Sequence, residues 1–316
     1  MPAASAPAAT LPRHRRLAPA RPRWGEHVIA ALLFACAALS VAVTVGIVIA
    51  LAGPTIEFFG SVDLGSFYGG TDWSPLFSPP KFGVLPLVTA TLTTTFWALV
   101  VAIPCGLGAA IYLSEYAKPR TRKILKPVLE VLAGVPTVVY GFFALTFLTP
   151  LIQDIWFLPG DPPAVFNALS AGLVMGVMIL PTVASLSEDA MASVPQGLRQ
   201  GAFALGATRM KVATKVVVPA ALSGIVASFV LGISRAVGET MIVLIAAGGT
   251  PNLSFNPTEA MQTMTAFIAA AGIGDQPTGS VGYKTIFAVG ATLFVATFVM
   301  NMLSTRLVRK YREVYE

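Results

Sequence analysis

The stretch Gly232-Ile-Ser-Arg-Ala-Val-Gly-Glu-Thr-Met241 decides the fold of this chain. It lies within an apolar run, from about 220 to 248, that is long enough to cross a membrane. Arg235 and Glu239 fall near the middle of that run. A lone charge at that depth costs about 2.5–3.5 kcal/mol on insertion scales, so it must face a protein interior or a water-filled path. Spaced four residues apart, the two side chains should share one helix face, which predicts a route for a charged solute.

Composition indicates a multi-pass membrane protein. Of the 316 residues, 55% are hydrophobic and only 11% are charged, and the mean hydropathy is +0.75. A soluble core of this size would need far more surface charge. The net charge of +6 does not indicate nucleic-acid binding, because the basic residues gather in loops and tails. The two cysteines and two histidines form no cluster, so we expect neither a metal nor a cofactor.

Six apolar runs are long enough to form transmembrane helices, which predicts an all-α fold. The runs lie near 28–52, 86–113, 128–149, 165–187, 220–248 and 284–308. Eighteen of the 21 Lys and Arg residues fall in the N-terminal tail, the loops after the second and fourth runs, and the C-terminal end. This bias predicts that both termini are cytoplasmic.

The same pattern divides the chain into four parts. We expect a disordered basic tail at 1–27, a first helix with an outside loop at 28–83, a core at 84–308 and a cytoplasmic tail at 309–316. The outside loop from 53 to 83 is rich in Gly, Pro and aromatic residues. It is compatible with a short interfacial structure or with a docking surface.

Helix breakers inside the runs are candidate hinges. Pro104, Pro136 and Pro181 each free a backbone group that neighbouring helices or water must satisfy. Gly172 and Gly176 form a small-residue face for close helix contact. Ordinary bundle packing explains these residues as well as a gated pathway does.

The loop from 188 to 219 carries a second pattern. After Val194-Pro195 it reads Gln200-Gly201-Ala202, then Gly206 four residues on, and ends with Val216-x-Val218-Pro219. Pro195 suits a helix start, and Gly206 should break the first helix and allow a second from Thr208. The alternative is an ordinary amphipathic linker.

That spacing resembles the coupling loop of ABC importer permeases, Glu-Ala-Ala-x3-Gly-x9-Ile-x-Leu-Pro, with Gln200 and Gly201 in place of Glu and Ala. The lost carboxylate puts any family salt bridge at that position in doubt. The segment Arg235-Ala-Val-Gly-Glu-Thr-Met241 resembles a signature of phosphate-specific permeases. Three further segments resemble the C-type (PstC type) subunit of that system: Phe82 to Leu87, Tyr112 to Tyr116 and Glu130 to Gly141. The resemblance covers roughly 82 to 308.

The resemblance implies a type I (MetI-like) importer permease with one extra N-terminal helix, in a bacterial plasma (inner) membrane. It implies three protein partners besides phosphate and lipid: a paralogous permease (PstA type), a cytoplasmic ATPase dimer (PstB type) and an external phosphate-binding protein (PstS type). The chain has no Gly-x4-Gly-Lys-[Ser/Thr] loop, so ATP hydrolysis belongs to a partner. The residues expected to contact the ATPase are Gln200, Gly201, Ala202, Leu205, Gly206, Ala207, Lys211 and Pro219.

The expected translocation residues are Arg235, Glu239, Thr240 and Ser228. Gly224, Ser228 and Gly232 continue the face of Arg235 and would give a small, polar stripe for a solute. Arg235 should attract the anion transiently, while Glu239 holds the arginine or a gate. A structural ion pair between the two is the alternative.

Other functions remain open at this stage. Arginine binds any tetrahedral oxyanion, so sulfate, molybdate or phosphonate would serve the same residue. An intramembrane enzyme would need a paired nucleophile and base, which the runs lack. A channel or a secondary transporter would need no loop of the coupling type.

Overall fold

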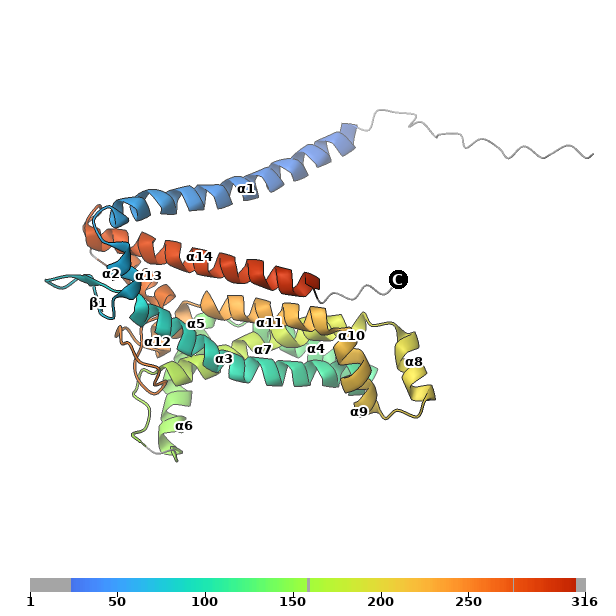
Figure 1. The fold of residues 1–316 in the computed structure, drawn as a ribbon. Coiled ribbons are helices and arrows are strands. Elements are labelled where there is room, and N and C mark those ends of the chain that lie inside the picture. Colours follow the sequence, from blue (N-terminus) through green and yellow to red (C-terminus); the bar gives the residue numbers. More distant parts are fainter. Residues whose placement is uncertain (1–23, 158–159, 275, 311–316) are drawn as a thin grey trace, which may run out of the picture. The chain divides into compact units, whose positions relative to one another are not determined.

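Long apolar helices dominate the structure, a computed structural model that describes residues 24–157, 160–274 and 276–310 (Figure 1). The chain divides into two units, residues 1–50 and 51–316. The described part of the first unit is the start of α1 (Trp24–Phe59), whose side chains from Gly25 to Ala50 are all exposed. The predicted tails lie largely outside the described residues, which begin at 24 and end at 310.

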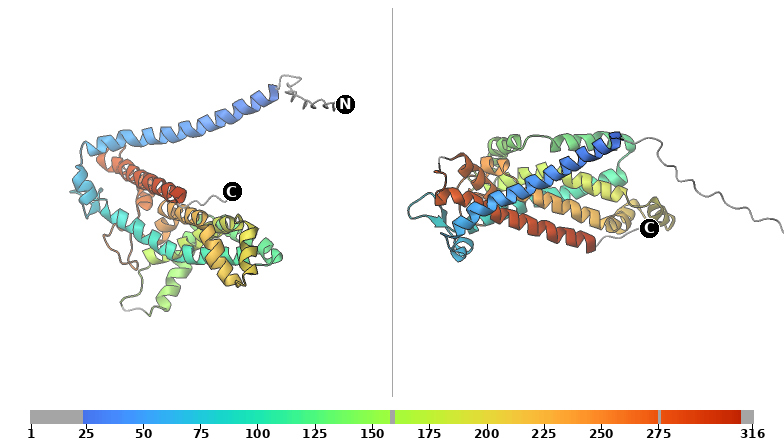
Figure 2. Two further views of the ribbon diagram at one scale, coloured as in Figure 1. Left: turned by 45° about the vertical axis from the view of Figure 1, so that its right-hand side comes forward. Right: turned by 90° about the horizontal axis from the view of Figure 1, so that it is seen from above.

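The core of the second unit is a bundle of α3 (Leu85–Ile111), α7 (Ala168–Ala192) and α11 (Leu222–Val237), which lie side by side in Figures 1 and 2. The small-residue face of α7 meets α3, as predicted. A Cβ on Gly172 would lie 2.9 Å from the Thr94 carbonyl oxygen, and one on Gly176 would lie 2.6 Å from that of Ala98. Only glycine permits this backbone approach.

Five helices of the described chain are long and apolar enough to cross a membrane, or six if a bent pair counts as one span. The bent pair joins residues 209–220 to α11 at an angle of 73°. The spans expected near 28–52, 86–113, 165–187 and 284–308 correspond to α1, α3, α7 and α14 (Val281–Lys310).

The expected third and fifth spans are not continuous helices. The third is divided into α4 (Pro119–Ala133) and a stretch formed by α5 (Thr137–Phe143), η2 (Ala144–Leu148) and α6 (Thr149–Asp154). The fifth is divided into α11 and α12 (Met241–Ala246). Hydropathy continues through Gly134-Val-Pro136 and Gly238-Glu-Thr240, but the helical hydrogen bonds do not. The span-length helix of the third run is therefore residues 137–154, later than the expected 128–149, and α11 ends at Val237 rather than near 248.

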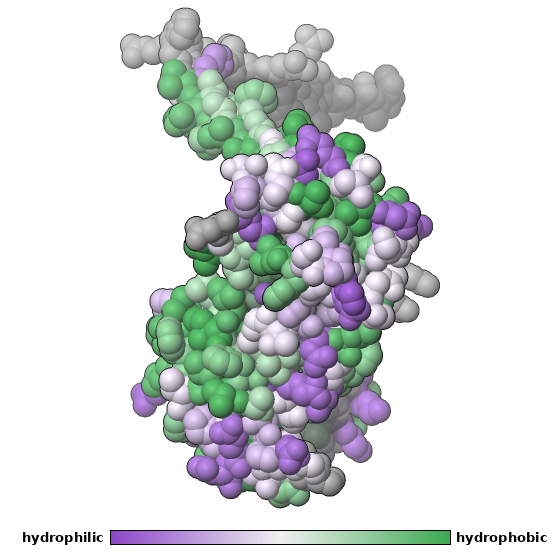
Figure 3. All heavy atoms as spheres, turned by 90° about the vertical axis from the view of Figure 1, so that its left-hand side faces the viewer, coloured by the Kyte–Doolittle hydropathy of each residue, from purple (hydrophilic) through white to green (hydrophobic). Residues whose placement is uncertain are grey.

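One end of this bundle, called here the hairpin end, is closed by aromatic packing. It holds α2 (Leu64–Gly69), the paired strands β1 (Trp73–Ser74) and β2 (Lys81–Phe82), and α13 (Met264–Ile273). Phe58, Phe67 and Trp73 are buried there, and the Trp73 ring lies 4.9 Å from that of Phe267. The loop predicted at 53–83 therefore packs most of its aromatic residues against the bundle. Figure 3 looks onto this end, where hydrophilic and hydrophobic residues are interspersed.

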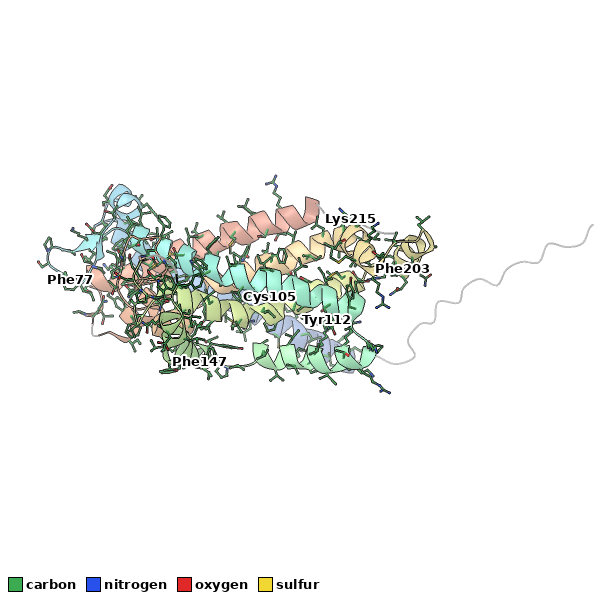
Figure 4. All side chains as sticks on the ribbon, turned by 90° about the horizontal axis from the view of Figure 1, so that it is seen from below. Phe77, Cys105, Tyr112, Phe147, Phe203 and Lys215 are labelled. Carbon is green, nitrogen blue, oxygen red and sulfur yellow. The ribbon has the colours of Figure 1, made fainter. Side chains whose placement is uncertain are left out.

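The opposite end, called here the α8 end, carries the predicted coupling loop. It holds η1 (Tyr112–Tyr116), α8 (Gln196–Ala204), α9 (Arg209–Val212), η3 (Ala213–Val217) and α10 (Val218–Ala220). Figure 4 labels Phe203 and Lys215 at this end and Phe77 at the other. The loop begins later than predicted, because α7 continues through Glu188 to Ala192.

Candidate translocation site and coupling loop

The two helix breaks lie close together. Pro136 forms the N-cap of α5, and the second break precedes α12. The two short helices pack at Gly141, where a Cβ would lie only 3.3 Å from the Ile242 Cα. Irregular backbone at membrane depth is tolerated where it is buried in protein or lines a water-filled cavity. The paired breaks thus interrupt two packed helices in the same part of the bundle.

Arg235 sits beside these breaks, in the last turn of α11. Its side chain is partly buried, and its Nη1 donates a hydrogen bond to Thr182 Oγ1 of α7 at 3.0 Å. Thr182 is its one hydrogen-bond partner among the described residues. Since a guanidinium carries five N–H donors, most of the fork remains available. A cation is also favoured at the C-terminal end of a helix.

Among the described contacts, the Glu239 carboxylate bonds the backbone of α12 and does not bond the Arg235 side chain. Its Oε1 accepts hydrogen bonds from the backbone amides of Met241 (3.0 Å) and Ile242 (3.2 Å), so the carboxylate caps α12. Its carbonyl oxygen accepts a bond from Thr265 Oγ1 at 2.6 Å. The prediction that Arg235 and Glu239 share one helix face was wrong, because α11 ends at Val237. The described hydrogen bonds and ion pairs of these two side chains do not join them.

The predicted polar stripe on α11 faces α7 and is closed within this chain. Ser228 is 1% exposed and shares a 2.7 Å hydrogen bond with Ser187. A Cβ on Gly224 would lie 2.4 Å from the Ala190 Cβ, and one on Gly232 would lie 3.2 Å from Val183 Cγ2. These residues bring two helices together, which differs from the open stripe expected. Thr240 lies in the break, partly exposed, with its hydroxyl 3.4 Å from the Gly238 carbonyl oxygen.

The three prolines occupy different surroundings. Pro136 stands at a helix break, and it is the one that coincides with an interruption. Pro104 is exposed inside α3, and Pro181 is buried inside α7, and both helices continue through them. A hinge at any of the three stays a prediction.

The coupling loop has the predicted local structure. Gly206 separates α8 from α9 with φ at +79°, a conformation that side chains disfavour. Thr208 caps α9 by accepting a bond from the Lys211 amide at 3.4 Å. Leu205, at the turn between the two helices, is 90% exposed.

The other residues expected to contact the ATPase surround this turn. Gln200, Gly201, Lys211 and Pro219 are exposed, while Ala202 and Ala207 are partly buried. Ala202 and Ala207 pack against an apolar cluster that includes Met191, Val194, Val212 and Val217. The tip is thus exposed and its base is anchored.

A charge cluster that was not predicted from the sequence lies next to this base. Glu188 of α7 is fully buried and is bonded by two cations of α4, Arg122 and Lys126, the latter at 2.8 Å. Lys126 also pairs with the exposed Asp189 at 2.8 Å. The sequence carried one sign of this cluster: Glu188 and Asp189 are adjacent acidic residues at the end of an apolar run, and a basic loop follows the second run.

These contacts fix the protonation state of Lys126. Its hydrogen bonds to Asp189 and then Glu188 raise the pKa of Lys126 above its ordinary value. A raised lysine pKa contributes stability below the unfolded pKa, and this is lost only as the pH rises through the folded one. Lys126 therefore stays protonated near neutral pH.

Comparison with known proteins agrees with this geometry. Residues 102–313 match the model of the family described as "Binding-protein-dependent transport system inner membrane component". A probable ABC transporter permease protein of Bacillus subtilis, YqgH, is 38% identical over 275 residues, covering 86% of this chain and 87% of the relative. Phosphate transport system permease protein PstC of Pasteurella multocida is 32% identical over 313 residues, covering 90% and 93%. PstC of Xylella fastidiosa is 31% identical over 265 residues, covering 78% and 80%.

Solved structures show the same fold. A bacterial alginate ABC transporter aligns with a TM-score of 0.64 at 14% identity, covering 91% of this chain and 97% of the other. The MetNI methionine ABC transporter aligns with a TM-score of 0.52 at 19% identity, covering 73% and 95%. Both support the predicted type I importer fold. With a family model that covers most of its length, this chain belongs to the inner-membrane permease components of binding-protein-dependent ABC importers.

Proposed function

We propose that this chain is the PstC-type permease subunit of an ATP-driven phosphate importer. The observation that carries the proposal is Arg235, a partly buried guanidinium beside two helix breaks whose one described partner is the neutral Thr182. Relatives named PstC, 31% and 32% identical to this chain, support phosphate as the anion. The lower-ranked alternative is another oxyanion, since the same fork would accept sulfate, molybdate or phosphonate.

Arg235 attracts the anion through charge and forked donors. A phosphate that leaves water needs a counter-charge, and a guanidinium offers parallel N–H bonds to two of its oxygens. Because a neutral hydroxyl rather than a carboxylate holds the side chain, no fixed anion must be displaced when phosphate arrives. Glu239 acts by keeping α12 and the break in place, through its bonds to the Met241 and Ile242 amides.

The partners follow from the family and from the two ends of the bundle. A permease of this class works with an ATPase and a binding protein, and we assign them here to the PstB and PstS types. The α8 end faces the cytoplasm, where Leu205 and its neighbours enter a cleft on the ATPase. A PstA-type permease completes the pathway around Arg235.

One experiment addresses the anion. The purified complex, with its ATPase and its binding protein, is placed in proteoliposomes, and ATP hydrolysis and uptake are measured with phosphate-loaded and sulfate-loaded binding protein. We expect stimulation of both by phosphate and none by sulfate. Stimulation by sulfate alone would make the chain a permease for another oxyanion.

A second experiment addresses orientation. Reporter fusions are made at residue 316 and after the end of α6, within 155–163. We expect a cytoplasmic signal from 316 and an external signal from the loop, because the basic bias lies in the tails and the α8 end. An external signal at 316 contradicts the six-span topology.

A further inference from the structure

Helix α8 is attached to the bundle by an unusual contact. All nine of its residues are described, and Arg199 alone is buried, with a side chain that is 9% exposed. Most short surface helices attach through an apolar stripe. Although Ala202 of α8 packs against the apolar cluster, the one buried side chain of this helix is a cation, and Leu198 and Phe203 stay 39% and 44% exposed.

The Arg199 guanidinium binds two transmembrane helices at once. Its Nε and Nη2 donate to Glu115 Oε1, at 3.2 and 3.1 Å, and Glu115 belongs to η1, the continuation of α3. Its Nη1 donates to the Val194 carbonyl oxygen at 2.5 Å, and Nη2 donates to that of Met191 at 2.7 Å. Met191 lies in the last turn of α7, and Val194 lies two residues beyond its end, in the short link to α8. The two bonds to Glu115 and the bond to Met191 therefore join α8 to the ends of α3 and α7, while the bond to Val194 holds the link between α7 and α8.

The chemistry of this contact makes it rigid. An apolar stripe tolerates sliding, whereas a planar fork holds its acceptors in fixed directions. Glu115 is itself held, because Ser114 Oγ donates to Oε1 at 3.0 Å. The carboxylate is 9% exposed, so water does not compete freely for it. Movement of α8 is thus passed to α3 and α7 together.

We propose that Arg199 is a positioning residue that converts displacement of α8 into joint movement of α3 and α7. It touches neither the solute nor nucleotide. The proposal rests on the proposed docking of the Leu205 turn into the ATPase, but not on phosphate as the anion. Arg199 determines how much transport each hydrolysis event drives, and Glu115 is its fixed counterpart.

The test measures anion transported per ATP hydrolysed in the reconstituted complex with its partners. Arg199→Gln should keep the ATPase bound and hydrolysing, yet lower the transport-to-hydrolysis ratio by at least about tenfold, because the fork that joins α8 to η1 and α7 is lost. Glu115→Gln should lower it less, because the bonds to Met191 and Val194 remain. Arg199→Lys should fall between wild type and Arg199→Gln, since it keeps the charge and loses the fork. Arg120→Gln, at an exposed arginine of α4, is the matched control and should leave the ratio unchanged.

The double variant tests whether Arg199 and Glu115 act as one unit. If Glu115 acts through Arg199, the double variant Arg199→Gln with Glu115→Gln should be no worse than Arg199→Gln alone. An unchanged ratio in Arg199→Gln, or fully additive losses, overturns the proposal. So does a loss of thermal stability with a normal ratio, which marks a purely structural role. Leu205→Asp is assayed for ATPase association, and if the ATPase still binds normally, the docking assignment fails independently of Arg199.

Discussion

Two arginines of this chain show opposite uses of the same side chain. Arg199, at the α8 end, donates four hydrogen bonds, and its main partner is a carboxylate. Arg235, beside the helix breaks, donates one bond to a neutral hydroxyl. The cluster around Glu188 resembles the Arg199–Glu115 pair, because in both a buried carboxylate is bonded by a cation. Glu188 has two such cations, Arg122 and Lys126.

The difference between these two arginines distinguishes a structural role from the role in transport that we propose. A guanidinium whose donors are occupied fixes the backbone around it and has little to offer a ligand. A guanidinium with free donors inside a membrane raises the free energy of the protein, so we expect such a residue to have a function. Arg199 and Glu188 thus hold elements together, whereas Arg235 is the cation that we propose to meet the anion.

The largest effect should come from removing the available charge. In Arg235→Gln we expect phosphate uptake to be abolished, while complex assembly stays normal, because Arg235 forms one bond within the bundle. Uptake of radiolabelled phosphate in assembled complexes is the measurement. Arg235→Lys should also be impaired, since it keeps charge but loses the fork. Wild-type uptake by Arg235→Gln would remove the difference between the two arginines and move the pathway elsewhere.

Removing a charge that is already paired within the protein should lower stability rather than transport. Glu188 is fully buried, so Glu188→Gln removes the negative charge that Arg122 and Lys126 share and turns the acceptor of one of them into an NH2 donor. Removing one partner of a buried pair costs about 3–5 kcal/mol, and we expect the lower end because the two cations are partly exposed. Thermal unfolding of the purified subunit measures it. Asp189→Asn, at a side chain that is 58% exposed, is the control and should cost less than about 1 kcal/mol.

The sequence predicted elements better than it predicted their interruptions. Apolar length located α1, α3, α7 and α14, since hydropathy reports lipid exposure and burial directly. It did not reveal that Gly134-Val-Pro136 and Gly238-Glu-Thr240 end helices, because nothing in hydropathy distinguishes a continuous run from two short helices. The small-residue pattern of α7 and the turn at Gly206 were predictable, because each follows from sterics at a glycine.

The candidate site was predicted in part, for a related reason. Arg235 stood out because a charge in an apolar run is rare. Its relation to Glu239 was misjudged, since spacing of four residues implies a shared face only if the helix continues. Ser228 was placed on an open stripe, although its hydroxyl bonds Ser187 of a helix that is 41 residues away in sequence. Long-range contacts such as Arg199 to Glu115 leave no periodic pattern.

The turn at the tip of the coupling loop should have an intermediate effect. Gly206 has φ at +79° with nothing near its Cβ position, so strain and not crowding limits substitution there. The left-handed conformation costs a side chain about 1–2 kcal/mol. In Gly206→Val we expect the subunit to reach the membrane, with reduced ATPase association and uptake. Co-purification of the ATPase measures this, and Gly206→Asn should be milder because asparagine tolerates that conformation. Normal association and uptake in Gly206→Val contradict the role of the turn.

The smallest effect tests how loosely Arg235 is held. Thr182→Val removes the single bond to Nη1 and keeps the size of the side chain. A hydrogen bond to a charged group contributes about 1.5–3 kcal/mol at most, and a partly exposed guanidinium regains some of this from water. If Thr182 only orients the arginine between passing anions, its loss should change the apparent KM for uptake by a few-fold and leave assembly and stability unchanged. Thr182→Ser keeps the hydroxyl and should behave as wild type. A loss in Thr182→Val as complete as that in Arg235→Gln would mean that Arg235 works only while fixed to α7, and the distinction between a committed and an available arginine would no longer hold.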